Sequence, residues 1–426
     1  MQMLIKNGQV LDPGKIDGKK DILIKDGRIE AVIDPAETVP ADTRVIDATG
    51  RVVVPGLIDI HVHLREPGHE YKETIETGLK AAARGGFTAV CSMPNTQPVN
   101  DNSQITRFII NRATELGGTK VYPAGAISSG SLGKNLAEIF DMKEAGIVAV
   151  TDDGRPLENA NLMRRALEYC NGLNLPVFVH AEELSLAAGG AMNEGTFSTL
   201  SGIKGIPNAA ESIMVLRDIA LSELTHAPVH FCHISTAESI EAIRQAKKRG
   251  TRVTCETAPH YFTLTDGDIK GYDTNFKMNP PLRSAADKQA VIDGLIDGTV
   301  DLIASDHAPH SVVEKDLEFD RAAFGILGLE TSLSLSLKLV QEGHLSLEDL
   351  VVKMSKNPAG LIRIDNDIKP GNPADLTLID LDSEYTVDPE TFLSKSRNTP
   401  FGGFKVKGRA VVTLVDGRVV YQDEPA

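Results

Sequence analysis

The sequence predicts an α/β chain built around a closed (β/α)8 barrel, with a small composite β-sandwich formed by the N- and C-terminal segments. Three observations support this prediction. The chain has 426 residues, short apolar segments alternate with helical patterns between residues 56 and 365, and turn signals recur at both ends. Strands that alternate with helices pair in parallel, and eight of them can close a barrel. We expect the β-domain in segments 1–55 and 366–426, and the barrel in 56–365.

The barrel prediction rests on eight apolar segments with helical stretches between them. Residues 74–83 show helical spacing and end at Gly85-Gly86, and Ser346 begins a capping-box pattern for a later helix. An open doubly wound sheet is the alternative, but it normally carries a G-x-G-x-x-G turn after its first strand, and that turn is missing from the sequence. The expected strands are 57–63, 87–92, 120–125, 147–151, 176–180, 228–233, 251–256 and 301–305.

The chain ends carry hairpin signals. Asn7-Gly8, Asp26-Gly27 and Asp416-Gly417 each lie between apolar flanks, and such pairs favour tight two-residue turns. Residues 376–379 form another strand-like run. Hairpins at both ends indicate one β-domain assembled from the two ends; two separate β-domains are the alternative, but each would be too short to bury much core.

Composition excludes several functional classes. Lys and Arg total 44 against 59 Asp and Glu, a formal net charge of -15, which argues against binding to phosphate backbones. No run of about 18 apolar residues occurs and the start does not resemble a signal peptide, so we expect a soluble chain that does not enter membranes. The scattered Cys91, Cys170, Cys232 and Cys255 are typical of reduced thiols in a cytoplasmic protein.

Polar residues gather at the ends of the expected strands. His61 and His63 are two apart, so they share one face of the first strand. Histidines and aspartates also end four other strands: Asp152 or Asp153, His180, His233 and Asp306. Nitrogen and carboxylate donors without thiolate suit zinc, manganese or iron, with zinc first, and this number of donors predicts two ions. His230 and Cys232 are expected to face the helices, because they alternate out of phase with His233.

Several motifs occur together in a definite order. They are D-x-H-x-H-x-R at 59–65, M-P-N-T at 93–96, T-D-D-G at 151–154, M-N-P-P-L-R at 278–283 and A-S-D-H-A-P-H at 304–310. On these motifs, nearly the whole chain resembles the amidohydrolase superfamily and, within it, the bacterial class I dihydroorotases. The resemblance implies a zinc-dependent, reversible cyclisation of N-carbamoyl-L-aspartate to (S)-dihydroorotate, the third step of de novo pyrimidine synthesis.

The resemblance also implies roles for individual residues. It implies two zinc ions bridged by Asp153 and a hydroxide, with Asp306 as the acid–base residue and Arg65 as the main partner of the substrate carboxylate. The implied ligands are His61, His63 and Asp306 for the first ion and His180 and His233 for the second. The implied substrate-binding residues are His63, Arg65, Asn95, Asn279, His310, Phe324 and Gly325.

Two alternative functions are related to this one. Hydantoinases and allantoinases are related cyclic amidases, but many relatives bridge their metals with a carboxylated lysine, and residues 147–151 contain none. A catalytically silent homologue that scaffolds aspartate transcarbamoylase would have lost metal ligands, whereas every implied ligand is present. The resemblance further implies a homodimer and leaves open a complex with aspartate transcarbamoylase.

Overall fold

The expected barrel is present in the computed structural model, which describes residues 2–35 and 43–423. Its eight strands pair in parallel in the order β15-β14-β13-β10-β9-β8-β7-β6. A parallel bridge between Val62 and His307 joins the first strand to the segment after the last and closes the ring. Each strand coincides with a predicted segment: β6 Leu57–Val62, β7 Phe87–Ser92, β8 Lys120–Gly125, β9 Ala149–Val150, β10 Val177–Val179, β13 Val229–Phe231, β14 Val253–Thr257 and β15 Leu302–Ile303.

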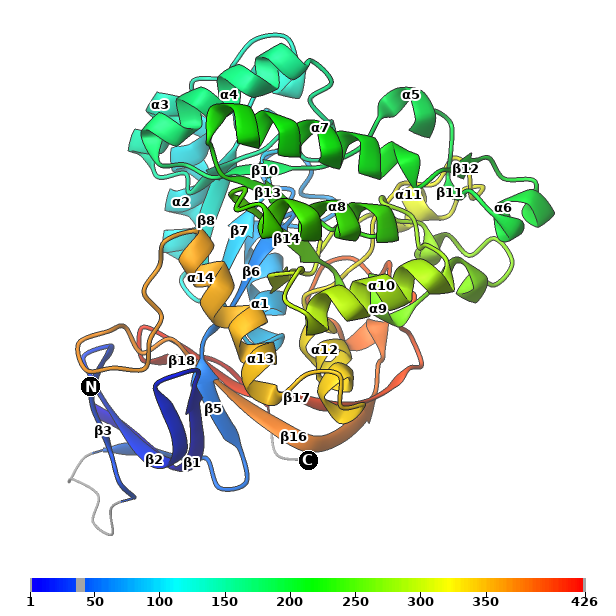
Figure 1. Ribbon diagram of the computed structural model, residues 1–426. Helices are drawn as coiled ribbons and strands as arrows, with labels where there is room; N and C mark the ends of the chain where they lie inside the picture. The colour runs from blue at the N-terminus through cyan, green and yellow to red at the C-terminus, as the bar shows by residue number, and fades with distance from the viewer. Residues whose placement is uncertain (1, 36–42, 424–426) are drawn as a thin grey trace.

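Helices surround the barrel and bury apolar faces against its strands (Figure 1). Val215 of α7 and Val229 of β13, for example, belong to the same core. Thr74 caps α1. As the sequence predicts, Gly85 ends α1 and Ser346 caps α13. The helices are α1 Ile75–Arg84, α2 Ser103–Leu116, α3 Ile139–Ala145, α4 Ala160–Leu173, α5 Leu184–Ala187, α6 Thr196–Ser201, α7 Ala209–Thr225, α8 Ala237–Lys248, α9 Pro259–Thr263, α10 Ala285–Ile296, α11 Val312–Lys315, α12 Ser332–Gln341, α13 Leu347–Val351 and α14 Asn357–Leu361.

The two chain ends form one further hydrogen-bonded sheet beside the barrel (Figure 1). The ends meet where β5 pairs antiparallel with β16, and the sheet has an apolar core of its own that includes Ile5, Val53 and Leu414. The strand order is β18-β17-β16-β5-β1-β2-β3, with β4 beside β1. The bounds are β1 Gln2–Asp12, β2 Ile16–Lys25, β3 Arg28–Ile33, β4 Arg44–Asp47, β5 Val52–Pro55, β16 Leu376–Thr386, β17 Lys405–Val415 and β18 Arg418–Gln422.

Two of the three predicted hairpin turns are confirmed. Asp26-Gly27 joins β2 to β3, and Asp416-Gly417 joins β17 to β18. The prediction for Asn7-Gly8 is wrong, because this pair forms a bulge inside β1. The bulge separates the half of β1 that pairs with β4 from the half that pairs with β5. Gly8 is needed there because a Cβ atom would lie 2.6 Å from Cγ2 of Val53.

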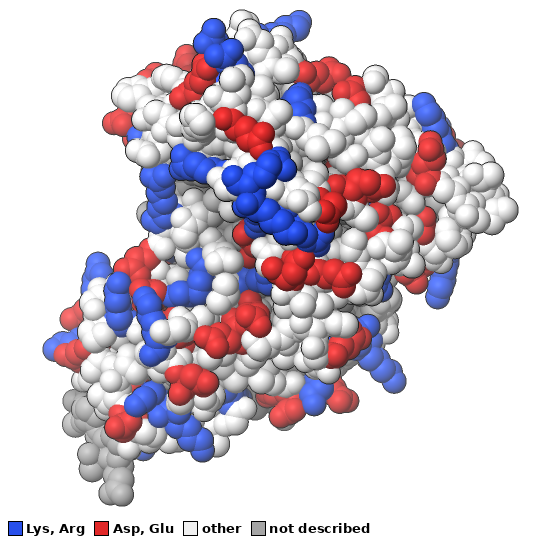
Figure 2. Space-filling model, viewed as in Figure 1, with Lys and Arg blue, Asp and Glu red and all other residues white. Residues whose placement is uncertain are grey.

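The surface and the helices agree with the composition. Figure 2 shows Lys and Arg side chains interspersed with Asp and Glu on the visible face, so the net charge of -15 is not gathered there in one patch. In the described ranges, no helix combines the length and the apolar character needed to cross a membrane.

Candidate active site

The carboxyl ends of the barrel strands bring the expected metal-ligand residues together in one buried cluster. Asp153, which follows β9, lies at its centre. The Asp153 carboxylate oxygens lie 3.3 Å from His61 Nε2 and 3.5 Å from His63 Nε2. Oδ1 of Asp153 also lies 3.6 Å from both His180 Nδ1 and His233 Nε2. One carboxylate therefore faces four imidazole rings that come from three different strands.

Asp306 follows β15 and completes this cluster. Its Oδ1 lies 3.2 Å from His63 Nε2 and 3.6 Å from His61 Nε2. Asp306 and His233 have φ angles of +47° and +36°, a region that non-glycine residues rarely adopt and that is often found at functional sites. The chain thus turns sharply just past each strand end, where these two side chains join the cluster.

Asp152, the alternative to Asp153, is occupied elsewhere. Its Oδ1 accepts hydrogen bonds from the backbone N–H groups of Ile127 and Ser128 at 2.9 and 3.1 Å. The Ser128 hydroxyl donates to its other oxygen. Asp152 therefore anchors the loop after β8, and Asp153 is the aspartate that lies among the histidines.

The prediction that His230 and Cys232 face the helices is wrong. Phe231, between them, packs in the outer core, whereas Cys232 packs in the cluster inside the barrel. Nε2 of His230 lies 3.1 Å from Oε2 of Glu256. The alternation of side chains cannot be counted back from His233, because the positive φ angle of that residue interrupts the strand geometry.

The polar atoms at the centre of the cluster fit a bound metal. His61 Nε2 and Asp153 Oδ1 are buried and neither makes a hydrogen bond, although such atoms are usually satisfied in folded proteins. The ligand atoms of His61, His63 and Asp306 lie within 4.8 Å of one another, as do those of His61, Asp153 and His233. Two overlapping groups of nitrogen and carboxylate donors suit metal ions such as zinc.

The charges in the cluster hold its carboxylates ionised. Burial raises the pKa of the Asp153 carboxyl, but the charge of His61 and the nearby imidazoles of His180 and His233 outweigh burial and hold this pKa well below its usual value. Burial of Asp306 is likewise outweighed by its hydrogen bond from His63 and by the neighbouring imidazoles, so its pKa is also lowered. Both groups are therefore ionised and suited to binding a cation.

Arg65 and His310 contact each other, and Asn95 contacts His63. Arg65 is buried, its Nε donates to the carbonyl of Pro309 at 3.1 Å, and its Nη2 lies 3.3 Å from Nε2 of His310. Nδ1 of His63 donates to Oδ1 of Asn95 at 2.8 Å. A buried guanidinium beside the histidine cluster is suited to binding a carboxylate.

Asn279 is linked to the cluster through Glu182. Its Nδ2 donates to Oε1 of Glu182 at 3.0 Å, and Oε2 of Glu182 lies 3.4 Å from Nε2 of His180. The segment 324–325 lies beside it, because the N–H of Gly325 donates to the carbonyl of Lys277 at 3.0 Å. The structure thus places every expected site residue in or next to one region.

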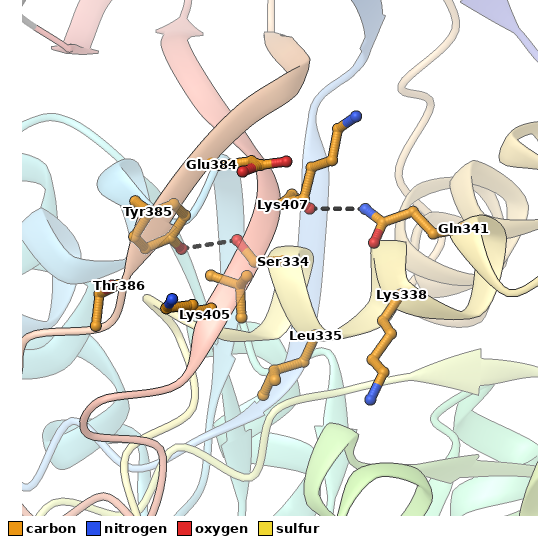
Figure 3. Close-up of a pocket in the computed structure, with 10 residues that line it drawn as sticks. Ser334, Leu335, Lys338, Gln341, Glu384, Tyr385, Thr386, Lys405 and Lys407 are labelled. Carbon is orange, nitrogen blue, oxygen red and sulfur yellow. Dashed lines mark hydrogen bonds between the residues drawn. The ribbon is translucent and has the colours of Figure 1, made fainter.

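Two cavities differ in their relation to the cluster. One of about 400 Å³ is lined by Asn95, Asp153 and Arg155, among others, and therefore reaches the candidate site. Another, of about 470 Å³, lies between α12 and strands β16 and β17 (Figure 3). Ser334 and Tyr385 share a 2.8 Å hydrogen bond there, but none of the expected site residues lines this cavity.

Sequence reasoning missed two acidic residues that contact the histidines. Oε1 of Glu256 lies 2.7 Å from Nδ1 of His61, and Glu182 contacts His180. Glu256 is buried in β14, and a carboxylate in the middle of an otherwise uncharged strand was the signal that could have found it. Glu182 carries no comparable signal, because it lies in a loop just after β10.

A closed parallel barrel with histidines and aspartates at the carboxyl ends of its strands defines a metal-dependent hydrolase class. A family model described as Dihydro-orotase-like matches residues 50–239. The chain is 64% identical over its full length to all of a dihydroorotase from Desulforapulum autotrophicum. It is also 55% identical, over 99% of its length, to all of a dihydroorotase from Geobacter metallireducens. The chain belongs to the dihydroorotase family.

The solved structures that it resembles include hydantoinases. The L-hydantoinase (dihydropyrimidinase) from Arthrobacter aurescens has a TM-score of 0.90 and 28% identity, with 100% of this chain and 97% of that chain covered. A dihydropyrimidinase from Brevibacillus agri has a TM-score of 0.84 at 24% identity, with 100% and 96% covered. The latter likeness shows the fold alone.

Proposed function

We propose that this protein is a class I dihydroorotase. It catalyses the reversible cyclisation of N-carbamoyl-L-aspartate to (S)-dihydroorotate and water, in de novo pyrimidine synthesis. The observation that carries this proposal is the position of Asp153 among four histidines. The strand before it offers no lysine to carboxylate, which favours this class over a hydantoinase.

The donor geometry supports a site for two zinc ions. Asp153 would serve both ions, since its carboxylate faces His61 and His63 of one ligand set and His180 and His233 of the other. When bound, the ions would lower the pKa of water and polarise the amide carbonyl. The proposed ligands are His61, His63 and Asp306 for one ion, and His180 and His233 for the other.

Asp306 is the proposed acid–base residue. In the hydrolytic direction, the hydroxyl of a water molecule adds to the amide carbonyl carbon, the C–N bond breaks, and a proton passes to the ring nitrogen. The lowered pKa of Asp306 keeps this carboxylate ionised. In the proposed step it takes up that proton from water. The protonated carboxyl then delivers the proton to the leaving nitrogen, and the reverse sequence closes the ring.

The remaining residues bind the substrate. Arg65, with Asn95 and His310, holds the carboxylate that both substrate forms carry, and His63 lies beside it. On the other side, Asn279 and the backbone of 324–325 contact the pyrimidine ring.

The test combines metal analysis with assays of the purified protein on dihydroorotate, hydantoin and allantoin. We expect two zinc ions per chain and hydrolysis of dihydroorotate well above that of the other two rings. One ion or none, or a preference for hydantoin or allantoin, would overturn the proposal.

Two further expectations accompany the function. We propose that the chain divides into segments 1–55, 56–365 and 366–426, consistent with β5 ending at Pro55 and β16 beginning at Leu376. The homodimer, the complex with aspartate transcarbamoylase and the cytoplasmic location stay predictions; sedimentation of the purified protein, alone and with the transcarbamoylase, tests the first two.

A further inference from the structure

Lys315, the last residue of α11, is a buried cation held by three carbonyl groups. Its Nζ donates to the carbonyl oxygens of Lys277, Ala323 and Gly325 at 3.1, 2.9 and 3.1 Å. Only 6% of the residue is exposed. Within residues 2–35 and 43–423, no carboxylate lies at ion-pair distance from Lys315. A buried charge without a counter-ion is costly, so this arrangement calls for an explanation.

The three carbonyls belong to segments 277–279 and 323–325, which carry the proposed substrate-binding residues Asn279, Phe324 and Gly325. We call these two segments the substrate-binding wall. Ala323 and Gly325 flank Phe324, and Lys277 precedes Asn279 by two residues. Nζ of Lys277 lies 4.3 Å from the centroid of the Phe324 ring, close enough for a cation–π contact. Lys315 therefore holds the backbone on both sides of Phe324, while Lys277 covers its ring.

A third side chain, that of Asn398, connects this wall to His310. Nδ2 of Asn398 donates to the carbonyls of Ala308 and Gly325, both at 3.0 Å. Oδ1 of Asn398 accepts from the N–H of His310 at 3.1 Å. His310 and Lys315 also line one cavity of about 420 Å³. The segments that carry Asn279, Phe324 and His310 thus meet around the Lys315 ammonium group.

The positive charges of Lys277 and Lys315 suit an anionic ligand. Burial lowers the pKa of Lys277 to about 8, with a smaller opposing effect of Asp320. Burial lowers the pKa of His310, and the charges of Arg65, Lys72 and then Lys315 lower it further. The field of Lys315 therefore reaches the group proposed to bind the substrate carboxylate. N-carbamoyl-L-aspartate carries two carboxylates, whereas dihydroorotate carries one, so this field acts more strongly on the open-chain form.

We propose that Lys315 is a positioning residue that fixes the substrate-binding wall through three carbonyls and favours the doubly charged open-chain substrate over the ring. This inference rests on the proposed function, because it takes the wall to be the one that binds dihydroorotate. It assigns Lys315 no contact with the reacting atoms.

The test compares three substitutions at Lys315 with a control elsewhere. Lys315→Met removes both donors and charge, Lys315→Gln keeps donors without charge, and Lys315→Arg keeps both. Lys353→Met is the matched control, because Lys353 is also buried and donates to a carbonyl, that of Val300, at the opposite end of β15. The readouts are KM and kcat in both directions at pH 6, zinc content and the thermal midpoint. Lys315 is charged at this pH, because burial, followed by the charge of Lys277, lowers its pKa only to about 7.

We expect Lys315→Met to raise KM for N-carbamoyl-L-aspartate about tenfold with kcat within about threefold of wild type. The rise for dihydroorotate should be smaller, Lys315→Arg should recover most of the loss, and Lys353→Met should lower only the thermal midpoint. If the methionine variant does not fold, Lys315→Gln carries the test, with the same larger effect on the open-chain substrate.

Unchanged KM in a folded Lys315→Met or Lys315→Gln protein would overturn the inference. An equal rise in KM for both substrates, or the same rise in KM in Lys353→Met, would also overturn it. Failure of the proposed function gives a different result, since the wild-type protein itself would then not act on dihydroorotate.

Discussion

Glu256 accepts a hydrogen bond from Nδ1 of His61 over 2.7 Å, and both side chains are buried inside the barrel. The other oxygen of Glu256 lies 3.1 Å from Nε2 of His230, whose Nδ1 contacts the hydroxyl of Thr254 at 2.8 Å. A histidine that donates from Nδ1 presents the lone pair of Nε2 to its other side. Here Nε2 of His61 faces Asp153, so Glu256 orients this ring as the proposed metal binding requires.

The first prediction concerns this pair. Glu256→Gln should weaken metal binding about 10- to 100-fold, because the amide accepts the His61 proton less strongly and holds the ring less firmly. Competition with a chelator measures this change without using activity. Glu223→Gln, on the exposed surface of α7, is the control and should retain wild-type affinity. Equal affinity in the two variants would contradict the role of Glu256.

The second prediction concerns Asp306. Asp306→Asn should lower kcat about 10²- to 10⁴-fold, because the amide cannot take up a proton from water. Much of the metal should be retained, since the four histidines and Asp153 still surround the site. Steady-state kinetics and metal analysis on the same sample check both statements. Substantial turnover in this variant would exclude the acid–base role.

The third prediction concerns Arg65. Arg65→Met should raise KM about 10- to 100-fold, since a charged hydrogen bond to the substrate carboxylate is lost. The zinc content should not change, because Arg65 contacts Pro309 and His310 and makes no contact with the ligand atoms of the cluster. Arg107→Met, on the exposed side of α2, is the control. A wild-type KM for the Arg65 variant would refute the assignment.

The fourth prediction concerns the pH dependence of stability. Burial, followed by the charge of Lys277, lowers the pKa of Lys315 to about 7, whereas an unfolded lysine has a value of about 10.4. Between these values the unfolded chain binds more protons, so the free energy of unfolding rises with pH. The free energy of unfolding, measured in urea, should increase for the wild type relative to Lys315→Met by up to about 1 kcal/mol per pH unit from pH 7 to 10. The same pH dependence of the free energy of unfolding in both proteins would contradict the lowered pKa of Lys315.

The fifth prediction concerns Gly325. Its φ angle is +132°, and an added Cβ would lie 2.7 Å from Cβ of Ala308 and 3.2 Å from Cδ2 of His310. Gly325→Ala should therefore displace the binding wall and raise KM severalfold. Gly343→Ala is the control, since Gly343 also has a positive φ angle but no atom within 4 Å of the added Cβ; it should lower only the thermal midpoint. An unaltered KM for Gly325→Ala would show that the wall tolerates the shift.

Local patterns predicted the strands because each barrel strand is a short apolar run bounded by helical stretches. All eight expected segments contain a barrel strand, and the Asp-Gly turns at 26–27 and 416–417 follow from local backbone preferences. The Asn7-Gly8 pair shows the limit of such reasoning. The same dipeptide that favours a turn forms a bulge here, because β1 changes its partner from β4 to β5 at that point.

The sequence by itself determined the residue types of the site and their places at the strand ends, since parallel strands bring their carboxyl ends to one rim. Only the tertiary structure decided which aspartate lies among the histidines, because Asp152 and Asp153 are adjacent and differ only in the partners that folding gives them. It also decided the contacts of Glu256 with His61 and of Lys315 with the wall around Phe324. Glu256 and His61 are 195 positions apart in the sequence, and Lys315 and Ala323 are 8 positions apart. Both contacts depend on packing that no local pattern encodes.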